Sequence, residues 1–365
     1  MTVNFLFSID LRVKLKVSLS LLMTEDLGDR MLVLAVRFLV ADIIAANLPK
    51  IADPGELVYT PEGIKLVTGG HPANMSVSLV KLDVPAHEIT LIGAVGDDVF
   101  GDFIEEELRR HGLNVIIQRI KGVGTTKDMI LVVKGEDRRF HVEVGATLYL
   151  DPDIVMKVLE ESRPLIAYVG SGLNGRLDDE LEEVLKVAKG YGSTTLVDLA
   201  KPYEKSWDFI VPSLRYADIF HCNDLELAEI TRETNLIEGL KSIKRMGVKL
   251  PLITLGDRGA YASIRSDVVY MPAFKVRVID PTGAGDAFCA GVIDWLLNNV
   301  RGKLKEGINR LTVSEVRDLL LWSQGVAAIK CTGVGTTTVS RSSTLELISE
   351  QGIKVINRTR IFKVT

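Results

Sequence analysis

The stretch Asp280–Phe288, which reads Asp-Pro-Thr-Gly-Ala-Gly-Asp-Ala-Phe, has the residue types of a site for an anionic group. It follows residues 273–279, whose pattern predicts a strand, and leads into small and apolar residues at helical spacing, 287–297. A Gly-rich turn that opens a helix points free backbone N–H groups and the positive end of the helix dipole at one place, which favours phosphate. Gly283 and Gly285 would let the backbone approach that group closely.

Asp286 falls in the first turn of this expected helix, beside the anion site. A carboxylate next to a phosphate is repelled unless it has a chemical task, and accepting the proton of an attacking hydroxyl is such a task. The alternative is ordinary helix chemistry, because Asp-Pro-Thr-Gly makes a good turn and first helical turns often carry an acidic residue. The motif alone leaves both interpretations open.

The composition excludes several classes of protein. The chain has 365 residues, of which 47% are hydrophobic and 25% charged, as in a globular protein with a sizeable core. A formal net charge of −4 offers no basic surface for nucleic acid. Cys222, Cys289 and Cys331 have no CxxC spacing and no even pairing, so neither a zinc site nor a disulfide framework is indicated. A reducing cytoplasm fits this cysteine usage.

The first 30 residues differ from the rest of the chain. They are basic and fairly apolar, but Asp10 and the basic residues interrupt the apolar run. This pattern disfavours a signal peptide, and a membrane helix would need about 20 apolar residues. We expect residues 1–30 to be an appended or poorly ordered N-terminal extension, residues 31–365 to form the functional domain, and no contact with a membrane.

Strand-like and helix-like segments alternate along the chain, which predicts an α/β fold with a mostly parallel sheet. Residues 31–47 are nearly all apolar, as in a strand buried on both faces. Asp42, where that run ends, is a candidate ligand-binding group at the sheet's carboxyl edge, or else a turn residue. Two turn-rich stretches, about 49–68 and 115–146, are expected to form a small sheet that covers a site.

Two helix starts carry candidate binding groups. Gly69 and Gly70 precede a helical pattern in which Asn74 lies in the first turn, with an amide that could bind hydroxyls, although a Gly-Gly turn with helix capping explains the same residues. Asn223-Asp224-Leu225-Glu226 is first of all a capping box, with Asn223 as N-cap and Glu226 at the third helical position. Capping would also fix Glu226 to organise water and Mg²⁺ near phosphates.

The run from Thr254 to Gly259, Thr-Leu-Gly-Asp-Arg-Gly, follows a strand pattern. Thr254 and the backbone of Gly256 could contact a nucleotide's phosphates, but taken alone the run favours a hairpin turn. The chain has no GxxxxGK[ST], which excludes a P-loop protein at the level of motif. It also has no GxGxxG after its first strand, which disfavours a dinucleotide-dependent oxidoreductase.

Together and in this order, these elements resemble the ribokinase-like (PfkB) family of carbohydrate kinases, over about Met31 to the C-terminus. The late Asp280–Asp286 motif is highly specific and Gly69–Asn74 moderately so. The resemblance implies a three-layer α/β/α fold with a mostly parallel central sheet and a small β-sheet lid. It also implies transfer of the γ-phosphoryl group of ATP to a hydroxyl of a sugar, with Mg²⁺, and a lid that often builds a homodimer.

The resemblance further implies roles for residues of this chain. Asp286 would be the catalytic base, and the amides of Gly283, Ala284 and Gly285 would form the anion hole. The sugar side would comprise Asp42, Gly70, His71 and Asn74. The nucleotide side would comprise Asn223, Thr254, Gly256, Gly259, Ala328, Gly333 and Gly335. Glu226 would hold Mg²⁺ through water, and Asp280 lies where some members bind a monovalent cation such as K⁺.

The sequence says less about which molecule accepts the phosphoryl group than about the transfer itself. Family members commonly carry a Gly and small polar residues in the first strand, where this chain has Arg37, Phe38 and Val40, and Val40 removes one sugar contact. Gly-Gly-His-Pro-Ala-Asn looks closest to fructokinase-like and ketosugar kinases. A nucleoside kinase of the same fold is an alternative, as is a non-catalytic sugar- or nucleotide-binding regulator, although a pure binder has no use for the Asp286 base.

Overall fold

The structure is a computed structural model, and it describes residues 31–136, 138–333 and 338–364. The expected N-terminal extension (residues 1–30) and Gly335 lie outside the described residues. Among the described residues, no helix combines the length and the apolar character that crossing a bilayer requires.

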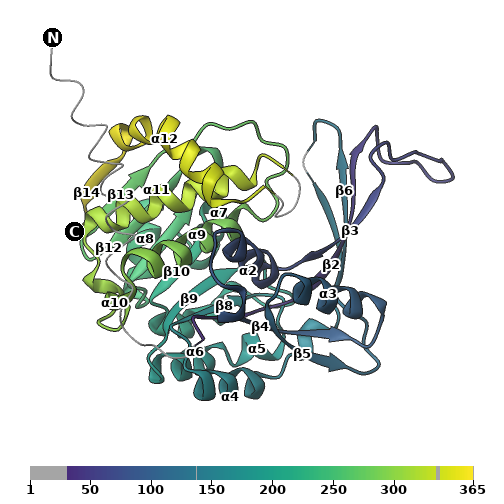
Figure 1. The fold of residues 1–365 in the computed structure, drawn as a ribbon, viewed down its shortest axis with the longest axis horizontal. Helices are drawn as coiled ribbons and strands as arrows, with labels where there is room; N and C mark the ends of the chain where they lie inside the picture. Colours follow the sequence, from purple (N-terminus) through teal and green to yellow (C-terminus); the bar gives the residue numbers. More distant parts are fainter. Residues whose placement is uncertain (1–30, 137, 334–337, 365) are drawn as a thin grey trace, which may run out of the picture.

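Two β-sheets organise the described chain (Figure 1). The main sheet has ten strands in the order β14-β13-β12-β11-β10-β9-β8-β1-β4-β5 within the described residues, parallel from β5 to β11 and antiparallel from β11 to β14. Its strands are β1 (Val33–Val36), β4 (Ile89–Gly96), β5 (Asn114–Ile120), β8 (Ile166–Ser171), β9 (Thr194–Leu199), β10 (Ile219–Asn223), β11 (Leu250–Thr254), β12 (Ala260–Ile264), β13 (Asp267–Met271) and β14 (Arg360–Lys363).

Helices cover both faces of the main sheet, so the expected three-layer α/β/α architecture is confirmed. Every residue of β1, β4, β8 and β9 is buried, as in a parallel sheet covered on both sides. One face packs against α2 (His71–Lys81), α3 (Val99–Arg110), α9 (Ala284–Asn299) and α11 (Val313–Lys330), with α12 (Arg341–Arg358) against α11. The other face packs against α4 (Pro152–Ser162), α6 (Leu181–Gly190), α7 (Asp224–Thr231) and α8 (Leu236–Arg245).

The remaining helical elements are short. They are the α-helices α5 (Arg176–Asp179) and α10 (Arg301–Leu304), and the 3₁₀ helices η1 (Ala86–Glu88), η2 (Ala146–Tyr149), η3 (Trp207–Tyr216), η4 (Gly256–Arg258) and η5 (Ile308–Arg310). Several of the longer helices begin at side chains that accept backbone N–H groups, as the capping rules predict. Asp98 caps α3, and Thr312 forms a capping box with Glu315 at the start of α11.

The second sheet has four strands in the order β3-β2-β6-β7 and projects from the main body (Figure 1). Its strands are β2 (Val40–Leu48), β3 (Ile64–Gly69), β6 (Lys127–Val133) and β7 (Arg139–Glu143). Strand β2 pairs in parallel with β6, while β3 and β7 form the antiparallel edges. We call this sheet the lid sheet.

Three expectations about strands were wrong. Residues 31–47 are not one buried strand: β1 joins the main sheet, the chain bends, and β2 joins the lid sheet. Asp42 is therefore the third residue of β2 and not a group at the main sheet's edge. Residues 115–120 belong to β5, where they pair with β4 and not with the lid. Residues 273–279 form no strand, and the N–H of Ile279 donates to the carbonyl of Cys331 rather than to a sheet partner.

Candidate active site

Helix α9 begins with a turn that leaves backbone donors free. Gly283 is its N-cap with φ 73°, a left-handed conformation that suits glycine. The N–H of Ala284 donates to the carbonyl of Pro281 at 3.2 Å. The N–H groups of Gly283 and Gly285 have no partner among the described residues. The turn therefore offers two glycine amides, together with the helix dipole, to an anion.

Asp286 lies in the first turn of α9 and is 4% exposed. Its Oδ2 accepts a hydrogen bond from Asn74 Nδ2 at 2.9 Å, and its Oδ1 lies 3.0 Å from His71 Nδ1. Both partners come from the first turn of α2, so the N-termini of the two helices meet at this carboxylate. The N-cap of α2 is Gly70, with φ 95°, and a Cβ there would lie 2.3 Å from the Phe38 carbonyl oxygen, so only glycine fits.

A cluster of buried charged side chains lies between Asp286 and the carboxyl ends of the central strands. Its centre is Asp198 at the end of β9, whose Oδ2 lies 2.6 Å from Tyr168 Oη, 2.8 Å from His71 Nδ1 and 3.3 Å from Arg37 Nη1. Its Oδ1 lies 2.7 Å from His221 Nδ1. Burial alone would raise the pKa of Asp198, but the charges and hydrogen bonds of His71 and His221 hold it well below its usual range. Asp198 is therefore ionised and fully engaged.

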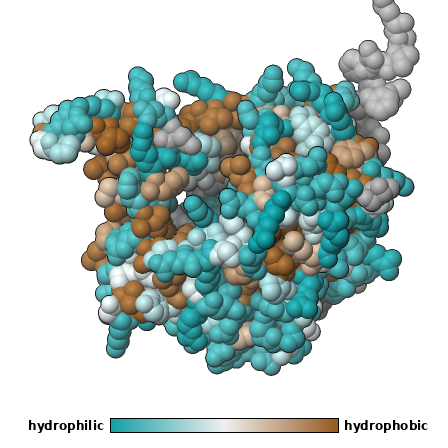
Figure 2. Space-filling model, turned by 180° about the vertical axis from the view of Figure 1, so that it is seen from behind, coloured by the Kyte–Doolittle hydropathy of each residue, from teal (hydrophilic) through white to brown (hydrophobic). Residues whose placement is uncertain are grey.

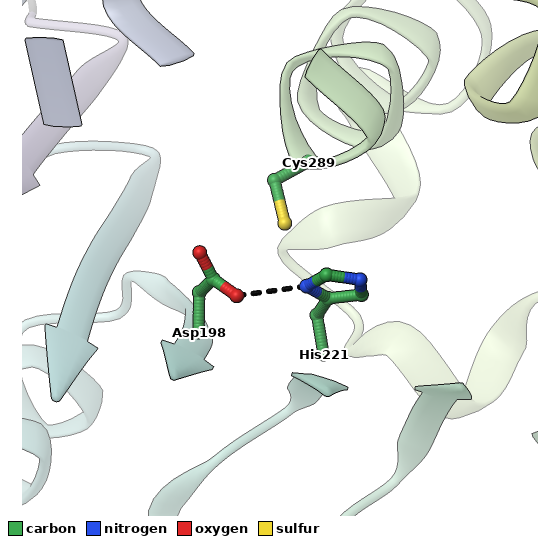
Figure 3. A group of neighbouring side chains, drawn as sticks. All are labelled: Asp198, His221 and Cys289. Atoms are coloured by element: carbon green, nitrogen blue, oxygen red, sulfur yellow. Dashed lines mark hydrogen bonds and ion pairs between the residues drawn. The ribbon is translucent and has the colours of Figure 1, made fainter. Parts of the chain in front are cut away.

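Two groups in this cluster have the spacing of metal ligands: Asp198 with His221 and Cys289, shown in Figure 3, and Asp198 with His71 and Asp286. Their donor chemistry does not fit a resident metal. The Nδ1 of His221 is occupied by Asp198, and burial keeps the Cys289 thiol protonated by raising its pKa well above the usual value. The His71 nitrogen is likewise shared between two carboxylates. We therefore interpret the cluster as a scaffold that holds His71 and Asp286.

A cavity of about 520 Å³ opens between the lid sheet, α2, α3 and the α9 turn. Asp42 from β2, Asn74 from α2, Thr282, Gly283 and Lys330 are among its polar lining groups. Burial, and then the nearby charges of Asp128 and Asp286, raise the pKa of Asp42 to about 8. Gly69 makes room for this carboxyl group, because a Cβ at that position would lie 2.0 Å from Asp42 Oδ2.

The other expected sugar-side residues do not line this cavity. The His71 ring contacts Asp198 and Asp286. The carbonyl of Gly70 accepts the Asn74 N–H at 3.0 Å. Both residues position Asn74 and Asp286, so Asp42 and Asn74 are the expected sugar-side residues that line the cavity.

The carboxyl edge of β10 and β11 carries four of the expected nucleotide-side residues: Asn223, Thr254, Gly256 and Gly259. Asn223 and Glu226 form the capping box of α7, with the Asn223 N–H donating to Glu226 Oε2 and the Glu226 N–H to Asn223 Oδ1, each at 2.9 Å. Burial raises the pKa of Glu226. In the parallel register Thr254 pairs with Asn223, which places the two motifs side by side.

The turn after Thr254 is a hairpin connection between β11 and the antiparallel β12, as the pattern favoured. Gly256 and Gly259 have φ 61° and 108° and permit the turn. Ala328 lies half-buried in α11, and Gly333 follows the end of that helix. Whether these residues contact a nucleotide stays a prediction.

Sequence reasoning missed four residues that the structure brings to the site: Arg138, Tyr168, Asp198 and Lys330. Arg138, just before β7, donates to the Thr282 hydroxyl at 2.6 Å and so ties the lid sheet to the α9 turn. Asp198 and Tyr168 carried a signal, since each is a polar group inside an otherwise apolar strand pattern. Arg138 carried none, because nothing in its local sequence separates it from other surface charges.

Arg37, which the sequence showed only as a departure from a family pattern, is fully buried beneath the site. Its Nη2 donates to the Ser171 carbonyl at 2.9 Å, and its Nη1 also contacts His71. Gly170 makes the space, because a Cβ there would lie 1.8 Å from Arg37 Cδ. A small residue in β8 thus accommodates a large charged residue that directly follows the neighbouring strand β1.

The model of the pfkB family carbohydrate kinases matches residues 39–343. The chain belongs to this family. It is 28% identical over 246 residues to a fructokinase from Klebsiella pneumoniae, covering 62% of this chain and 76% of the relative. It is equally 28% identical over 246 residues to a ribokinase from Schizosaccharomyces pombe, covering 64% of this chain and 76% of that protein. This PfkB-family protein is therefore a sugar kinase.

Solved structures agree on the fold. A ribokinase from Giardia lamblia superposes with a TM-score of 0.73 at 23% identity, covering 88% of this chain and 99% of that one. A ribokinase from Arabidopsis thaliana has a TM-score of 0.67 at 20% identity, covering 87% of this chain and 99% of that one. The expected ribokinase-like architecture, with its lid sheet, is therefore confirmed for this sugar kinase.

Proposed function

We propose that this sugar kinase transfers the γ-phosphoryl group of ATP to a hydroxyl of a small sugar held in the lid cavity, with Asp286 as the base. One observation carries the proposal. Asp286 is hydrogen-bonded to Asn74, and both Asn74 and the N-cap Gly283 line the cavity. The carboxylate therefore lies where the acceptor cavity meets the free amides of the α9 turn.

The chemistry needs little beyond this placement. Phosphoryl transfer through a loose transition state depends mainly on alignment and on stabilising the charge of the transferred group. An acceptor hydroxyl beside Asn74 can give its proton to Asp286 as it attacks. The free amides of Gly283 and Gly285 stabilise the equatorial oxygens of the phosphoryl group. Closure by the lid sheet excludes water and limits ATP hydrolysis.

ATP and Mg²⁺ belong on the opposite side of the turn. The Arabidopsis ribokinase with this fold was solved with ribose and ATP. In this chain Glu226 uses only Oε2 in its capping box, and its Oε1 has no partner among the described residues. One carboxylate near phosphates suits Mg²⁺, which keeps several waters. Glu226 would hold the ion through water, and Mg²⁺ would neutralise charge on the phosphates.

A ketosugar is our preferred acceptor. The Gly-Gly-His-Pro-Ala-Asn run looks fructokinase-like, and the Klebsiella pneumoniae relative at 28% identity is a fructokinase. The cavity of about 520 Å³ lies in the range of small-molecule sites, and Asp42 and Asn74 supply the hydroxyl-binding groups that a sugar needs. The choice between a hexose and a pentose depends on these two side chains and on the lid.

We also propose that a second copy of the chain covers the lid sheet. Phe140 and Val142 on β7 are 50% and 44% exposed. They pair with Ile130 and Asp128 on β6, which in turn pair with Ile44 and Asp42 on β2, so these side chains share the face of the lid sheet that carries Asp42. Figure 2 shows apolar side chains on the part of the molecule that carries this sheet. Exposed apolar surface beside a site marks an interaction face.

Light scattering tests this dimer. We expect the wild type to be a dimer and Phe140→Glu to be a monomer. A monomeric wild type would contradict the proposal.

The acceptor is tested with purified protein, MgATP and a coupled assay of ADP release. Fructose, ribose, 2-keto-3-deoxygluconate, inositol and nucleosides form the panel, and a reaction without acceptor gives the background hydrolysis. We expect turnover with a ketosugar above that background. Turnover with nucleosides alone would replace the sugar by a nucleoside. ATP binding without turnover on any acceptor would favour a non-catalytic sugar- or nucleotide-binding regulator and would contradict the proposal.

A further inference from the structure

Lys330, the last residue of α11, is a buried lysine beside the phosphoryl-binding turn. Its side chain is 1% exposed, and its Nζ lies 2.9 Å from the backbone carbonyl oxygen of Asp280 and 3.3 Å from Asp280 Oδ2. Its Cε lies 3.7 Å from the point where a Cβ on Gly283 would stand. The ammonium group thus binds two oxygens of one residue, at the start of the turn that carries the free amides.

Asp280 organises that turn. Its Oδ1 accepts the Thr282 N–H at 2.9 Å, while the N–H groups of Ile279 and Asp280 donate to the Cys331 carbonyl at 2.8 and 3.3 Å. Burial would raise the pKa of Asp280, but the Thr282 bonds and Lys330 hold it below the usual range. An ionised Asp280 at the edge of a phosphate site needs a positive charge, because the phosphates would otherwise repel it.

The residues present do not fit the monovalent cation that resemblance to the family placed at Asp280. An ion bound to the Asp280 carbonyl and carboxylate would lie against Nζ, which already occupies the space between these oxygens. Two positive charges at contact distance in a half-buried site repel strongly. We propose that the Lys330 ammonium takes the place of the monovalent cation, so that this kinase works without K⁺. The inference rests on the phosphoryl transfer proposed above.

A lysine ammonium group and a bound monovalent cation would have the same electrostatic effect on Asp280. Each neutralises Asp280 and holds its carbonyl, and so fixes the turn that presents Gly283 and Gly285. The lysine is covalently attached, so it does not have to be recruited from solution. The consequence is a kinase whose rate is independent of which monovalent salt is present.

The test compares the wild type with Lys330→Ser and Lys330→Met, in KCl and in tetramethylammonium chloride at equal ionic strength. The wild-type rate should differ by less than about twofold between the salts, the scale of general screening effects. Lys330→Ser opens space beside Asp280, so we expect it to be slower by about 10²-fold without K⁺, because the turn is misplaced, and to recover with K⁺. Lys330→Met fills the space without a charge, and should be slow in both salts.

Thermal unfolding in the same salts gives a readout that does not need turnover. KCl should raise the melting temperature of Lys330→Ser relative to tetramethylammonium chloride and leave the wild type unchanged, because only the variant binds the ion. An exposed lysine on α6, changed as Lys186→Met, is the control and should behave as the wild type does. If the sugar panel fails, the proposed function fails while this readout still tests Lys330.

Three results would overturn the inference. The first is saturable activation of the wild type by K⁺, or its selective stabilisation by K⁺, and this result stands even if the variants do not fold. The second is a folded Lys330→Ser that K⁺ neither stabilises nor reactivates, which would mean that the lysine acts directly on the phosphates. The third is a Lys330→Met variant as fast as the wild type, which would mean that no charge is needed.

Discussion

The two halves of the proposed site differ in how deeply their residues are buried. The phosphoryl half is the N-terminus of α9, held over the edge of the main sheet by a cluster in which Arg37 is fully buried and Asp198 and His221 are nearly so. The acceptor half is the lid sheet, whose strand β7 is exposed along its whole length. In the proposed mechanism the reacting groups are therefore anchored in the core, while the groups expected to select the acceptor lie in a layer with few packing constraints.

This difference separates two kinds of mutational effect. Changes at the α9 turn or its support should lower kcat or stability with little effect on the sugar. Changes on β2 and its neighbours should alter KM for the sugar and leave the transfer step in place.

Asp286→Asn should give the largest loss. An amide cannot accept the hydroxyl proton, and removing a general base typically costs about 10²–10⁴-fold in rate. We expect kcat to fall in that range while ATP binding, measured by calorimetry, is retained. Asp318→Asn on α11, an exposed carboxylate paired with Arg317, is the control and should be neutral. Near-normal turnover of Asp286→Asn would show that the base lies elsewhere.

Arg37→Met should destabilise the fold, because it removes one partner from a buried ion pair and leaves the negative charge of Asp198 with less positive charge around it. Breaking such pairs costs about 3–5 kcal/mol. Urea unfolding should show that loss, whereas Tyr168→Phe, which removes only a hydroxyl hydrogen bond to the same carboxylate, should cost about 1–3 kcal/mol. Equal stability of Arg37→Met and the wild type would contradict the supporting role of the cluster.

Asp42→Ala should act on the acceptor side. With a pKa of about 8 the Asp42 carboxyl is mostly protonated at neutral pH. A hydrogen bond between neutral groups contributes about 0.5–1.5 kcal/mol, so KM for the sugar should rise by roughly 2- to 12-fold. The KM for ATP should stay near the wild-type value, because Asp42 belongs to the lid sheet. Steady-state kinetics with each substrate varied in turn measures both constants. A loss confined to kcat, with KM for the sugar unchanged, would place Asp42 in the transfer step instead.

Asp42→Asn should have the smallest effect, a gain in stability at high pH. The folded-state pKa of Asp42 is about 8 against an ordinary value of 3.8, so the folded protein holds this proton more tightly than the unfolded chain does. The contribution of Asp42 to stability is therefore lost progressively as pH rises between these two values. At pH 8 the variant should melt above the wild type, by about 2–4 °C for each kcal/mol of stability that the wild type has lost, and at pH 4 the two should coincide. A variant that melts lower at pH 8 would contradict the raised pKa.

Local patterns predicted the parts of the fold that local rules determine. The capping box at Asn223 and the helix start at Gly283 follow from residue types a few positions apart, and both are present. The alternation of strands and helices correctly predicted the layered α/β architecture. These features depend on hydrogen bonds within one turn and on burial of regular faces.

Features that depend on tertiary partners were not predictable. The bend after β1, which sends Asp42 into the lid sheet, is not visible in an apolar run that suits either sheet. Residues 273–279 have a strand-like pattern but pair with no strand, and the N–H of Ile279 donates instead to the carbonyl of Cys331 after α11. Lys330 and Asp280 are separated by 50 positions, so only the folded chain shows that the ammonium lies on the Asp280 oxygens.

We propose that the turn from Asp280 to Asp286 passes a phosphoryl group to a hydroxyl in the cavity beside Asp42. Phosphorus NMR of the wild-type reaction with MgATP and the best acceptor of the panel detects this transfer. We predict one new phosphate monoester signal that grows in step with ADP. Growth of inorganic phosphate alone, or unchanged ATP with every acceptor, would contradict the account.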